Sequence, residues 1–350
     1  MTDITAVLSL WGQDSLSPII TGFFERKRDG MSRKKKAVVT STGVTVHKKP
    51  LGLRIWNHRG YYLMFLPVLV FLIIVHYWPM LFIRYSLYDY YVVQPNHPFV
   101  GFKHFQTMFK TPGFWDAFRN TLVLSIMKLI ITTASSVIVS VLLNEMGNLF
   151  AKKTLQTVIY LPHFMSWAVV ASIFTLFLSA SNTGMLNGIL KDWGVLKESI
   201  SFLESKTWWR PVFYIINIWK ETGWGTIIFL ATLSGINPEL YEAADIDGAS
   251  RFQKIRYVTM PALANTIITV LILNLAKVMN MFESVFVLYN ASVYKIADVI
   301  STYIYRQTFG NAVSNYGYST AVGLFKSLVG CMLVLICNWA SKKTRGRGIV

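Results

Sequence analysis

The stretch that decides the fold runs from residue 242 to residue 261 and reads Glu-Ala-Ala-Asp-Ile-Asp-Gly-Ala-Ser-Arg-Phe-Gln-Lys-Ile-Arg-Tyr-Val-Thr-Met-Pro. It forms a polar loop between two long apolar segments. Asn237, just ahead of it, is a favourable N-cap, and Pro238 suits the first position of a helix. Gly248 is expected to end that helix, because glycine adopts the left-handed conformation at little cost.

A second short helix is expected after the glycine. Ser250 followed by Gln253 is the pattern of a capping box, in which each end of the pair satisfies a backbone N–H of the other. Pro261 is expected to break this helix before the next apolar run, because proline lacks the N–H that a helix interior needs. The loop therefore predicts a rigid elbow made of a helix, a glycine bend and a second helix.

One face of the first helix is unusually small. Leu240, Ala243, Ala244 and Asp247 fall on the same side at helical spacing, and the two alanines leave room for another backbone to approach. By itself, this pattern fits a docking element and also fits an amphipathic loop that is merely solvated.

The composition places the elbow in an integral membrane protein. The chain has 350 residues, of which 53% are hydrophobic and only 15% are charged, against about 25% charged in soluble domains. No apolar segment alternates with polar residues as barrel strands do, so helices are expected. Crossing a bilayer takes about 20 mostly apolar residues, and six segments reach that length: 61–83, 121–144, 156–179, 211–235, 262–288 and 318–340.

The 242–261 stretch closely resembles the EAA loop of the permease subunits of ABC importers. Val258 and Met260 stand where the family pattern has isoleucine and leucine. The positions that match in identity and spacing are Glu242, Ala243, Ala244, Gly248 and Pro261.

Two further stretches resemble the carbohydrate branch of that family. Residues 160–167, Tyr-Leu-Pro-His-Phe-Met-Ser-Trp, look like a segment of importers that take up fragments of complex polysaccharides. Residues 100–105 resemble the stretch that follows the first span of sugar-type permeases. The resemblance covers residues 60–340. It implies an all-α membrane protein with six transmembrane helices, the MetI-like permease bundle with a cytoplasmic coupling helix, and an oligosaccharide as substrate.

The resemblance also implies how such a chain is driven. The elbow at 237–248 would insert into a groove of a cytoplasmic ABC ATPase dimer, with Glu242 facing a basic residue and Gly248 setting the bend. Residues 1–350 contain no Gly-x-x-x-x-Gly-Lys-Ser/Thr phosphate loop. The chain is therefore expected to be no enzyme and to hold no cofactor, with ATP and magnesium bound by the ATPase. A second, similar permease and an extracellular substrate-binding lipoprotein are the other expected partners. The ATPase-coupling residues implied are Glu242, Ala243, Ala244, Asp247, Gly248 and Pro261.

Lysine and arginine placement predicts the orientation. The N-terminal tail, the 145–155 loop, the 237–261 loop and the C-terminal tail together carry about twice as many of these residues as the opposite side. Basic loops stay in the cytoplasm, so both termini are expected there, in a multi-pass protein of the cytoplasmic membrane. The net charge of +17 lies beside spans, so it indicates topology and membrane lipids as neighbours, with no nucleic acid.

These assignments divide the chain into three parts. Residues 1–60 are expected to be a cytoplasmic basic tail, in which Ile4, Val7, Leu8 and Trp11 could form an interfacial helix or remain disordered. Residues 61–340 form the permease domain, with the EAA-type loop at 237–261. Residues 341–350 form a second basic tail.

Polar residues inside the apolar segments are the candidates for a substrate path, because such groups face a bundle interior or water. Amides, charges and an aromatic ring together suit a sugar, and both signs of charge are present, so charge alone does not choose the substrate. The alternative is hydrogen bonding that holds the helices together. The candidates are Asn217, Trp219, Lys220, Glu221, Asn274, Lys277, Asn280 and Glu283.

Two other classes of membrane protein could also have several apolar segments. An intramembrane enzyme would need a catalytic constellation, and the sequence contains neither His-Glu-x-x-His nor Gly-x-Ser-x-Gly. A secondary carrier or channel that works alone remains the alternative, and the elbow argues against it.

Overall fold

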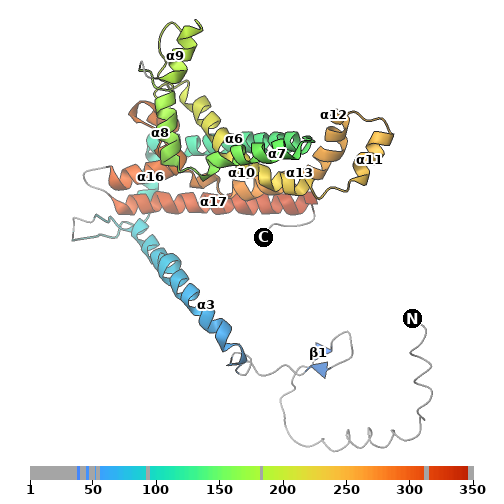
Figure 1. Cartoon of the computed structure of the whole chain (residues 1–350). Coiled ribbons are helices and arrows are strands. Elements are labelled where there is room, and N and C mark those ends of the chain that lie inside the picture. Colours follow the sequence, from blue (N-terminus) through green and yellow to red (C-terminus); the bar gives the residue numbers. More distant parts are fainter. Residues whose placement is uncertain are drawn as a thin grey trace, which may run out of the picture. The chain divides into compact units, whose positions relative to one another are not determined.

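The computed structural model in Figure 1 describes residues 38–39, 45–46, 52, 56–91, 95–181, 184–310 and 315–345. Its contacts divide the chain into two units, Met1–Tyr77 and Trp78–Val350. The interfacial helix expected near residues 4–11 and the end of the C-terminal tail lie outside the described residues.

The first unit contains one long helix. Its parts are α3 (Arg59–Leu72) and the π-helical turn η1 (Ile73–Tyr77). Apolar side chains cover this helix on all sides, and none of them is buried. Two short strands, β1 (Val38–Val39) and β2 (Thr45–Val46), pair antiparallel ahead of it. A helix that is apolar all round is typical of a membrane span.

The second unit is built around the pair formed by α6 (Pro112–Asn144) and α10 (Trp209–Leu233), which make the most extensive helix contact in the described chain. Ser136 Oγ donates to Thr222 O at 3.1 Å, and Thr226 Oγ1 donates to Ser136 O at 3.4 Å. Gly225 lies against Ser136, where an added Cβ would come within 2.3 Å of its Oγ. Small and hydroxyl-bearing residues therefore bring the two backbones close together, as they do in membrane bundles.

Other elements pack around this pair. α7 (Leu149–Tyr160) and η3 (Leu161–Phe164) meet α8 (Trp167–Phe177) at a bend of 101°, and Figure 1 shows α8 and α9 (Met185–Asp192) rising away from the direction of α7. Further elements of the unit are α4 (Trp78–Met80), η2 (Leu81–Leu87), α5 (Lys103–Lys110), α11 (Glu239–Ile246), α12 (Arg251–Lys254), η4 (Ile255–Thr259), α13 (Met260–Leu275) and α17 (Tyr316–Arg345).

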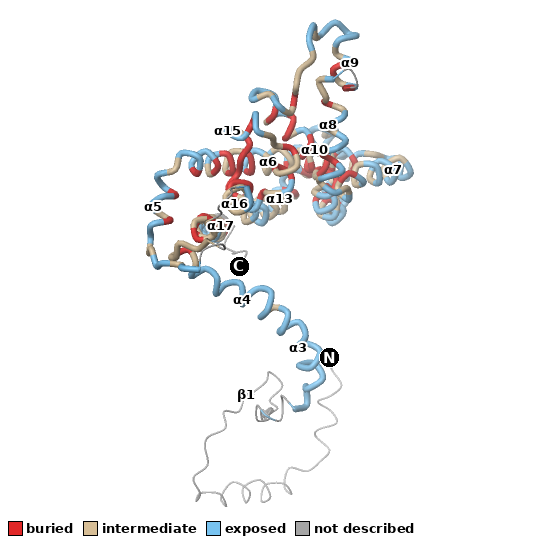
Figure 2. Tube along the Cα trace, turned by 90° about the vertical axis from the view of Figure 1, so that its left-hand side faces the viewer, coloured by how far each residue is buried: buried red, intermediate tan, exposed pale blue. Residues whose placement is uncertain are grey.

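The buried residues gather where α6, α10 and the segment after α13 meet, as the red parts of the tube in Figure 2 show. Trp209 and Phe213 stack at 5.1 Å in the largest cluster, and the Trp209 indole N–H donates to Leu288 O at 3.0 Å. A second cluster, around Phe114, joins α5, α6, α16 (Ile300–Phe309) and α17.

By length and composition, four helices of the described residues could cross a membrane, or five if the bent pair α7–η3 and α8 is one span. They correspond to five of the six expected segments, and the six-helix count stays a prediction. The exception is segment 211–235, which forms one helix, α10, with Lys220 and Glu221 among its residues and is not one of these four or five.

The expected helix at 262–288 is wrong in its second half, because α13 ends at Leu275. Shorter helical elements follow, and each of them contributes buried residues: η5 (Val278–Asn280), α14 (Glu283–Phe286), η6 (Ala291–Val293), α15 (Tyr294–Ala297) and α16 (Ile300–Phe309). Side chains of α6 satisfy this irregular backbone. Ser125 Oγ donates to Val278 O at 2.7 Å, and Asn120 Nδ2 donates to Asp298 O at 3.1 Å. Non-helical backbone is tolerated in a membrane protein where protein groups satisfy it.

Candidate functional site

The elbow has the local structure that the sequence predicts. Gly248 has φ +74°, in the left-handed region, between α11 and α12. The capping box is present: Ser250 N–H donates to Gln253 Oε1 at 2.7 Å, and Gln253 N–H donates to Ser250 Oγ at 3.4 Å. The two short helices are therefore fixed by interactions that depend only on neighbouring residues.

Two details of the elbow differ from expectation. α11 begins at Glu239, one residue later than expected, with Pro238 in the cap position; Asn237 Oδ1 still accepts the Glu239 N–H at 3.1 Å. Pro261 does not break the second helix, which runs as one from Arg251 to Leu275. The π-helical turn η4 lies directly ahead of the proline and changes the hydrogen-bond pattern there, so the helix accommodates its ring.

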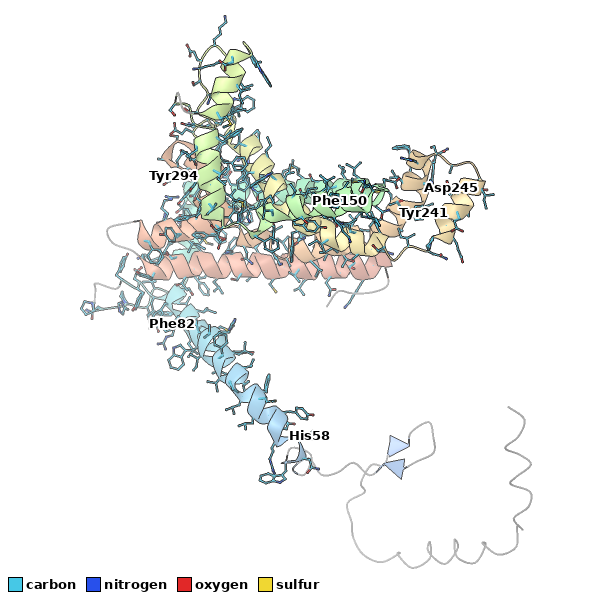
Figure 3. All side chains as sticks on the ribbon, in the orientation of Figure 1. His58, Phe82, Phe150, Tyr241, Asp245 and Tyr294 are labelled. Atoms are coloured by element: carbon cyan, nitrogen blue, oxygen red, sulfur yellow. The ribbon has the colours of Figure 1, made fainter. Side chains whose placement is uncertain are left out.

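Two contacts that sequence reasoning missed brace the elbow. Lys254 Nζ lies 2.7 Å from Asp245 Oδ1 across the glycine bend, and the Tyr241 hydroxyl lies 3.0 Å from Thr259 Oγ1. Tyr241 and Asp245 are labelled on this end of the unit in Figure 3. These pairs are separated by 9 and 18 positions and lie on opposite sides of the Gly248 bend, so the periodicity of a single helix does not predict them.

The outer surface of the elbow is open. Ile246 is 87% exposed and Phe252 70% exposed, and Glu242 and Ala243 are exposed as well. Glu242 makes no hydrogen bond or ion pair with the part of the chain that the structure describes. The elbow thus presents an acidic group and apolar side chains around a small-residue face.

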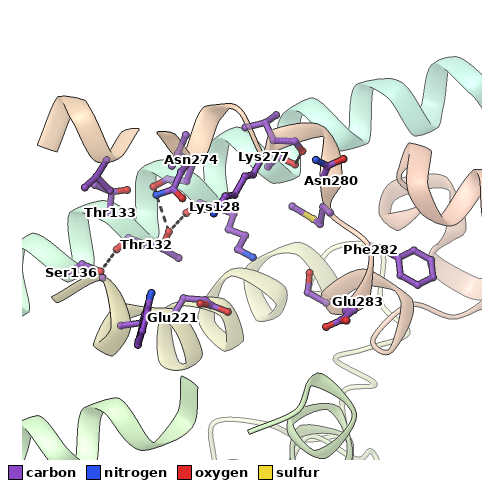
Figure 4. Close-up of a pocket in the computed structure, with 18 of the residues that line it drawn as sticks. Lys128, Thr132, Thr133, Ser136, Glu221, Asn274, Lys277, Asn280, Phe282 and Glu283 are labelled. Carbon is purple, nitrogen blue, oxygen red and sulfur yellow. Dashed lines mark hydrogen bonds between the residues drawn. The ribbon is translucent and has the colours of Figure 1, made fainter. Parts of the chain in front are cut away.

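A separate cavity of about 550 Å³ opens between α6, α10 and the end of α13 (Figure 4). It contains both acidic and basic groups, amides, hydroxyls and indole rings. Five of the eight residues expected in a substrate path line it: Glu221, Asn274, Lys277, Asn280 and Glu283.

The other three expected path residues lie outside the cavity lining. Asn217 is fully buried in α10 and donates to Phe213 O at 2.7 Å. Trp219 packs edge-on against Phe174. Lys220 is 4% exposed and faces the bend between η3 and α8.

The surroundings of Lys220 are backbone carbonyls. Its Nζ donates to Met165 O at 2.7 Å, to His163 O at 2.8 Å and to Pro162 O at 3.4 Å. A bend of 101° leaves carbonyls without helical partners, and an ammonium offers three donors. Lys220 therefore supports the bent segment.

His163 is held beside this bend. Its ring stacks on Trp224 at 4.7 Å and 9°, and its Nδ1 lies 3.2 Å from Glu221 Oε2. One carboxylate of the cavity wall is thus already engaged by a neighbouring side chain.

Several cavity residues were not among the sequence candidates. Lys128 comes from α6 and lies 5.7 Å from the Trp167 ring centroid. The signal that could have singled it out is a charge in the middle of an apolar segment. The hydroxyl-bearing residues and the indoles gave no such signal: Ser125, Thr132, Thr133, Ser136, Trp167 and Trp224.

The described residues contain no group of three or more His, Cys, Asp or Glu side chains that could hold a metal ion. The cavity instead offers hydrogen-bonding groups and charges of both signs. Such a lining can bind a polar organic molecule.

Both the sequence and the fold are similar to those of known proteins. The family described as "Binding-protein-dependent transport system inner membrane component" matches residues 136–346. Protein LplB of Bacillus subtilis (strain 168) is 40% identical, over 82% of this chain and 90% of that protein. The polygalacturonan/rhamnogalacturonan transport system permease protein YteP of the same strain is 37% identical, over 86% of this chain and 94% of that protein.

One solved structure is similar over almost the same length. It is a bacterial alginate ABC transporter in complex with an alginate pentasaccharide-bound periplasmic protein. The TM-score is 0.78 and the identity 35%, covering 86% of this chain and 100% of the other.

Proposed function

Because the chain belongs to the family of binding-protein-dependent transport system inner membrane components, we propose that it lines the oligosaccharide path of an ABC importer and receives energy through its α11 elbow. Its relatives include permeases of carbohydrate-type ABC importers, and the chain is a membrane-spanning permease of that kind. Coupling and substrate are the parts that need an experiment.

The observation that carries the coupling role is the braced yet open elbow. An element that transmits motion from a partner protein must be internally rigid, and its contact surface must be exposed. The Asp245–Lys254 ion pair and the Gly248 bend supply the rigidity, while Glu242 and Ala243 remain exposed. The proposed partner is a cytoplasmic ATPase dimer that has a basic group opposite Glu242. This ATPase would bind the ATP and magnesium. The chain itself carries out no catalysis.

The proposed assembly has three further members. A second, similar permease completes the path, and an extracellular binding lipoprotein delivers the oligosaccharide. The name of YteP and the pentasaccharide in the alginate transporter complex support a polysaccharide fragment as cargo.

The proposed topology has six spans and both termini in the cytoplasm. The distribution of lysine and arginine supports the orientation. With its 25 residues, α10 is about 37 Å long at 1.5 Å per residue, which exceeds the roughly 30 Å of a bilayer core. Its charged residues are bound inside the protein, as Lys220 and Glu221 are.

The first prediction tests the elbow. Glu242→Lys places a cation where the basic groove is proposed, and Gly248→Pro forbids the positive φ of the bend. Each variant should insert into the membrane normally but lose most of its ATP-driven oligosaccharide uptake in vesicles that contain the assembled importer. Each should also retain less ATPase during affinity purification.

The matched control is Glu198→Lys, which reverses an exposed acidic residue far along the chain from the elbow. It should retain the ATPase as well as the original chain does. Full ATP-driven uptake by Glu242→Lys would remove the coupling role. Uptake by the isolated chain without ATP would favour the stand-alone carrier.

A further inference from the structure

The lysines near the cavity fall into two groups according to their partners. Lys220 is saturated by three carbonyl oxygens behind the wall. Lys128 and Lys277 line the cavity, and the ammonium group of neither makes a hydrogen bond or ion pair within the described ranges. Figure 4 shows Lys128 reaching from α6 into the space, with Lys277 near it, two residues beyond the end of α13.

An ammonium held between membrane helices is costly, and such residues normally have a partner or serve a transported molecule. The indole of Trp167 gives Lys128 a cation–π contact at 5.7 Å, which leaves its three N–H donors without an acceptor. Lys220, 5.4 Å from the same ring, adds a second positive charge nearby. The ammonium of Lys128 therefore has no hydrogen-bond acceptor among the described residues.

The two carboxylates of the cavity make no hydrogen bond or ion pair with Lys128 or Lys277 among the described residues. Glu221 instead lies 3.2 Å from His163 Nδ1. Glu283 is exposed and begins the short helix α14 across the cavity from α6. Both are acceptors suited to sugar hydroxyls, and Asn274 and Asn280 add amides that can donate and accept.

We propose that this cavity binds an acidic oligosaccharide, with Lys128 and Lys277 pairing with a sugar carboxylate while the Asn and Glu side chains bind its hydroxyls. The inference rests on the proposed transport function and names the substrate class of that site. Neutral sugars need only the amides and carboxylates, whereas a uronic acid also supplies a charged acceptor for the two ammonium groups. Charged hydrogen bonds of this kind are the strong ones.

The test uses the assembled importer in detergent, without its binding protein, so that the permease site is measured alone. Two probes are compared by the ligand-dependent rise in thermal unfolding temperature: trigalacturonate and its neutral methyl ester. The acid should bind roughly tenfold or more tightly, the factor expected for one charged hydrogen bond. Lys128→Gln should remove most of that preference, because it weakens binding of the acid far more than binding of the ester.

Two further variants separate charge from folding. Lys128→Arg keeps the positive charge and should retain the preference for the acid. Lys326→Gln neutralises a lysine of α17 that donates to Ser301 Oγ at 3.0 Å outside the cavity, and should bind both probes normally.

Equal binding of the acid and its ester, or an equal loss of both in Lys128→Gln, would overturn the proposal. The importer function is checked separately by ATP-driven uptake in vesicles with the binding protein present. If the importer moves only neutral oligosaccharides, the acidic class fails and the transport function stands. If it moves no oligosaccharide with ATP, the transport function itself fails.

Discussion

At the scale of single residues, the position of Lys220 shows how a membrane bundle uses a buried cation. Its Nζ caps three carbonyls at the bend between η3 and α8. Within hydrocarbon no water can take that place, and each unsatisfied carbonyl is costly. The lysine expected to face a substrate instead makes the bent segment possible.

The prediction at this scale is that Lys220→Met destabilises the protein. The apolar side chain fits the space but leaves the carbonyls of His163 and Met165 without donors, at a cost of about 1–3 kcal/mol. The measurement is the apparent midpoint of thermal unfolding in detergent, compared with Lys206→Met at an exposed position. Equal midpoints for the two variants would show that the carbonyls have other donors.

At the scale of elements, the glycines of α10 set how closely its neighbours approach. A Cβ at Gly223 would lie 2.2 Å from Ile159 O, which is backbone of α7 and cannot rotate away. Gly225 lies on roughly the opposite side of the helix, about 200° further round, and there it meets Ser136 of α6. α10 therefore fixes the bent segment on one side and the cavity wall on the other.

The prediction at this scale is that Gly223→Ala forces α10 away from α7. Overpacking of this kind costs about 1–3 kcal/mol and should lower both the apparent unfolding midpoint and oligosaccharide uptake. Gly188→Ala in α9 is the control, since nothing lies within 4 Å of its Cβ position. There alanine should be neutral or stabilise by about 0.5–1 kcal/mol. A Gly223→Ala protein as stable as the control would contradict the close approach.

At the scale of the second unit as a whole, a polar network joins its two sequence ends. Asp89 lies 3.1 Å from Lys103 Nζ and 3.3 Å from His104 Nε2, and it accepts from Asn315 Nδ2 at 3.1 Å. Asn315 also donates to the Tyr91 hydroxyl at 2.9 Å. The network thus ties the segment after η2 to the start of α17, 226 positions away.

The prediction at this scale is a pH-dependent stability from Asp89. Burial alone would raise its pKa, but the hydrogen bonds from Lys103 and Asn315 and the charges of Lys103 and His104 hold the pKa of this carboxyl below its ordinary value. A lowered folded pKa contributes stability that is complete above the unfolded pKa of about 3.9 and is lost as pH falls through the folded value.

The measurement compares the apparent unfolding midpoints of the original protein and Asp89→Asn between about pH 3 and pH 7. The original should be more stable near neutral pH, and the difference should shrink as the pH falls below about 4. A difference that does not change over this range would show that the charge of Asp89 has no part in the network.

The sequence by itself determined the membrane class and the elbow. Long apolar runs leave the chain few alternatives to spanning helices. The bend at Gly248 and the capping box of Ser250 and Gln253 involve residues at most three positions apart, so their geometry follows from local rules. The proposed coupling role comes from the family pattern, because no local rule supplies it.

Only the tertiary structure decided which charged residues face the cavity. Lys220 and Glu221 are adjacent in sequence but about 100° apart on their helix, so one enters a backbone bend and the other the cavity wall. The packing of α6 and α8 against α10 decides which side of α10 faces the bend and which faces the cavity. The irregular backbone after Leu275 has the same origin, because its carbonyls are satisfied by Ser125 and Asn120, more than 150 positions earlier in the chain.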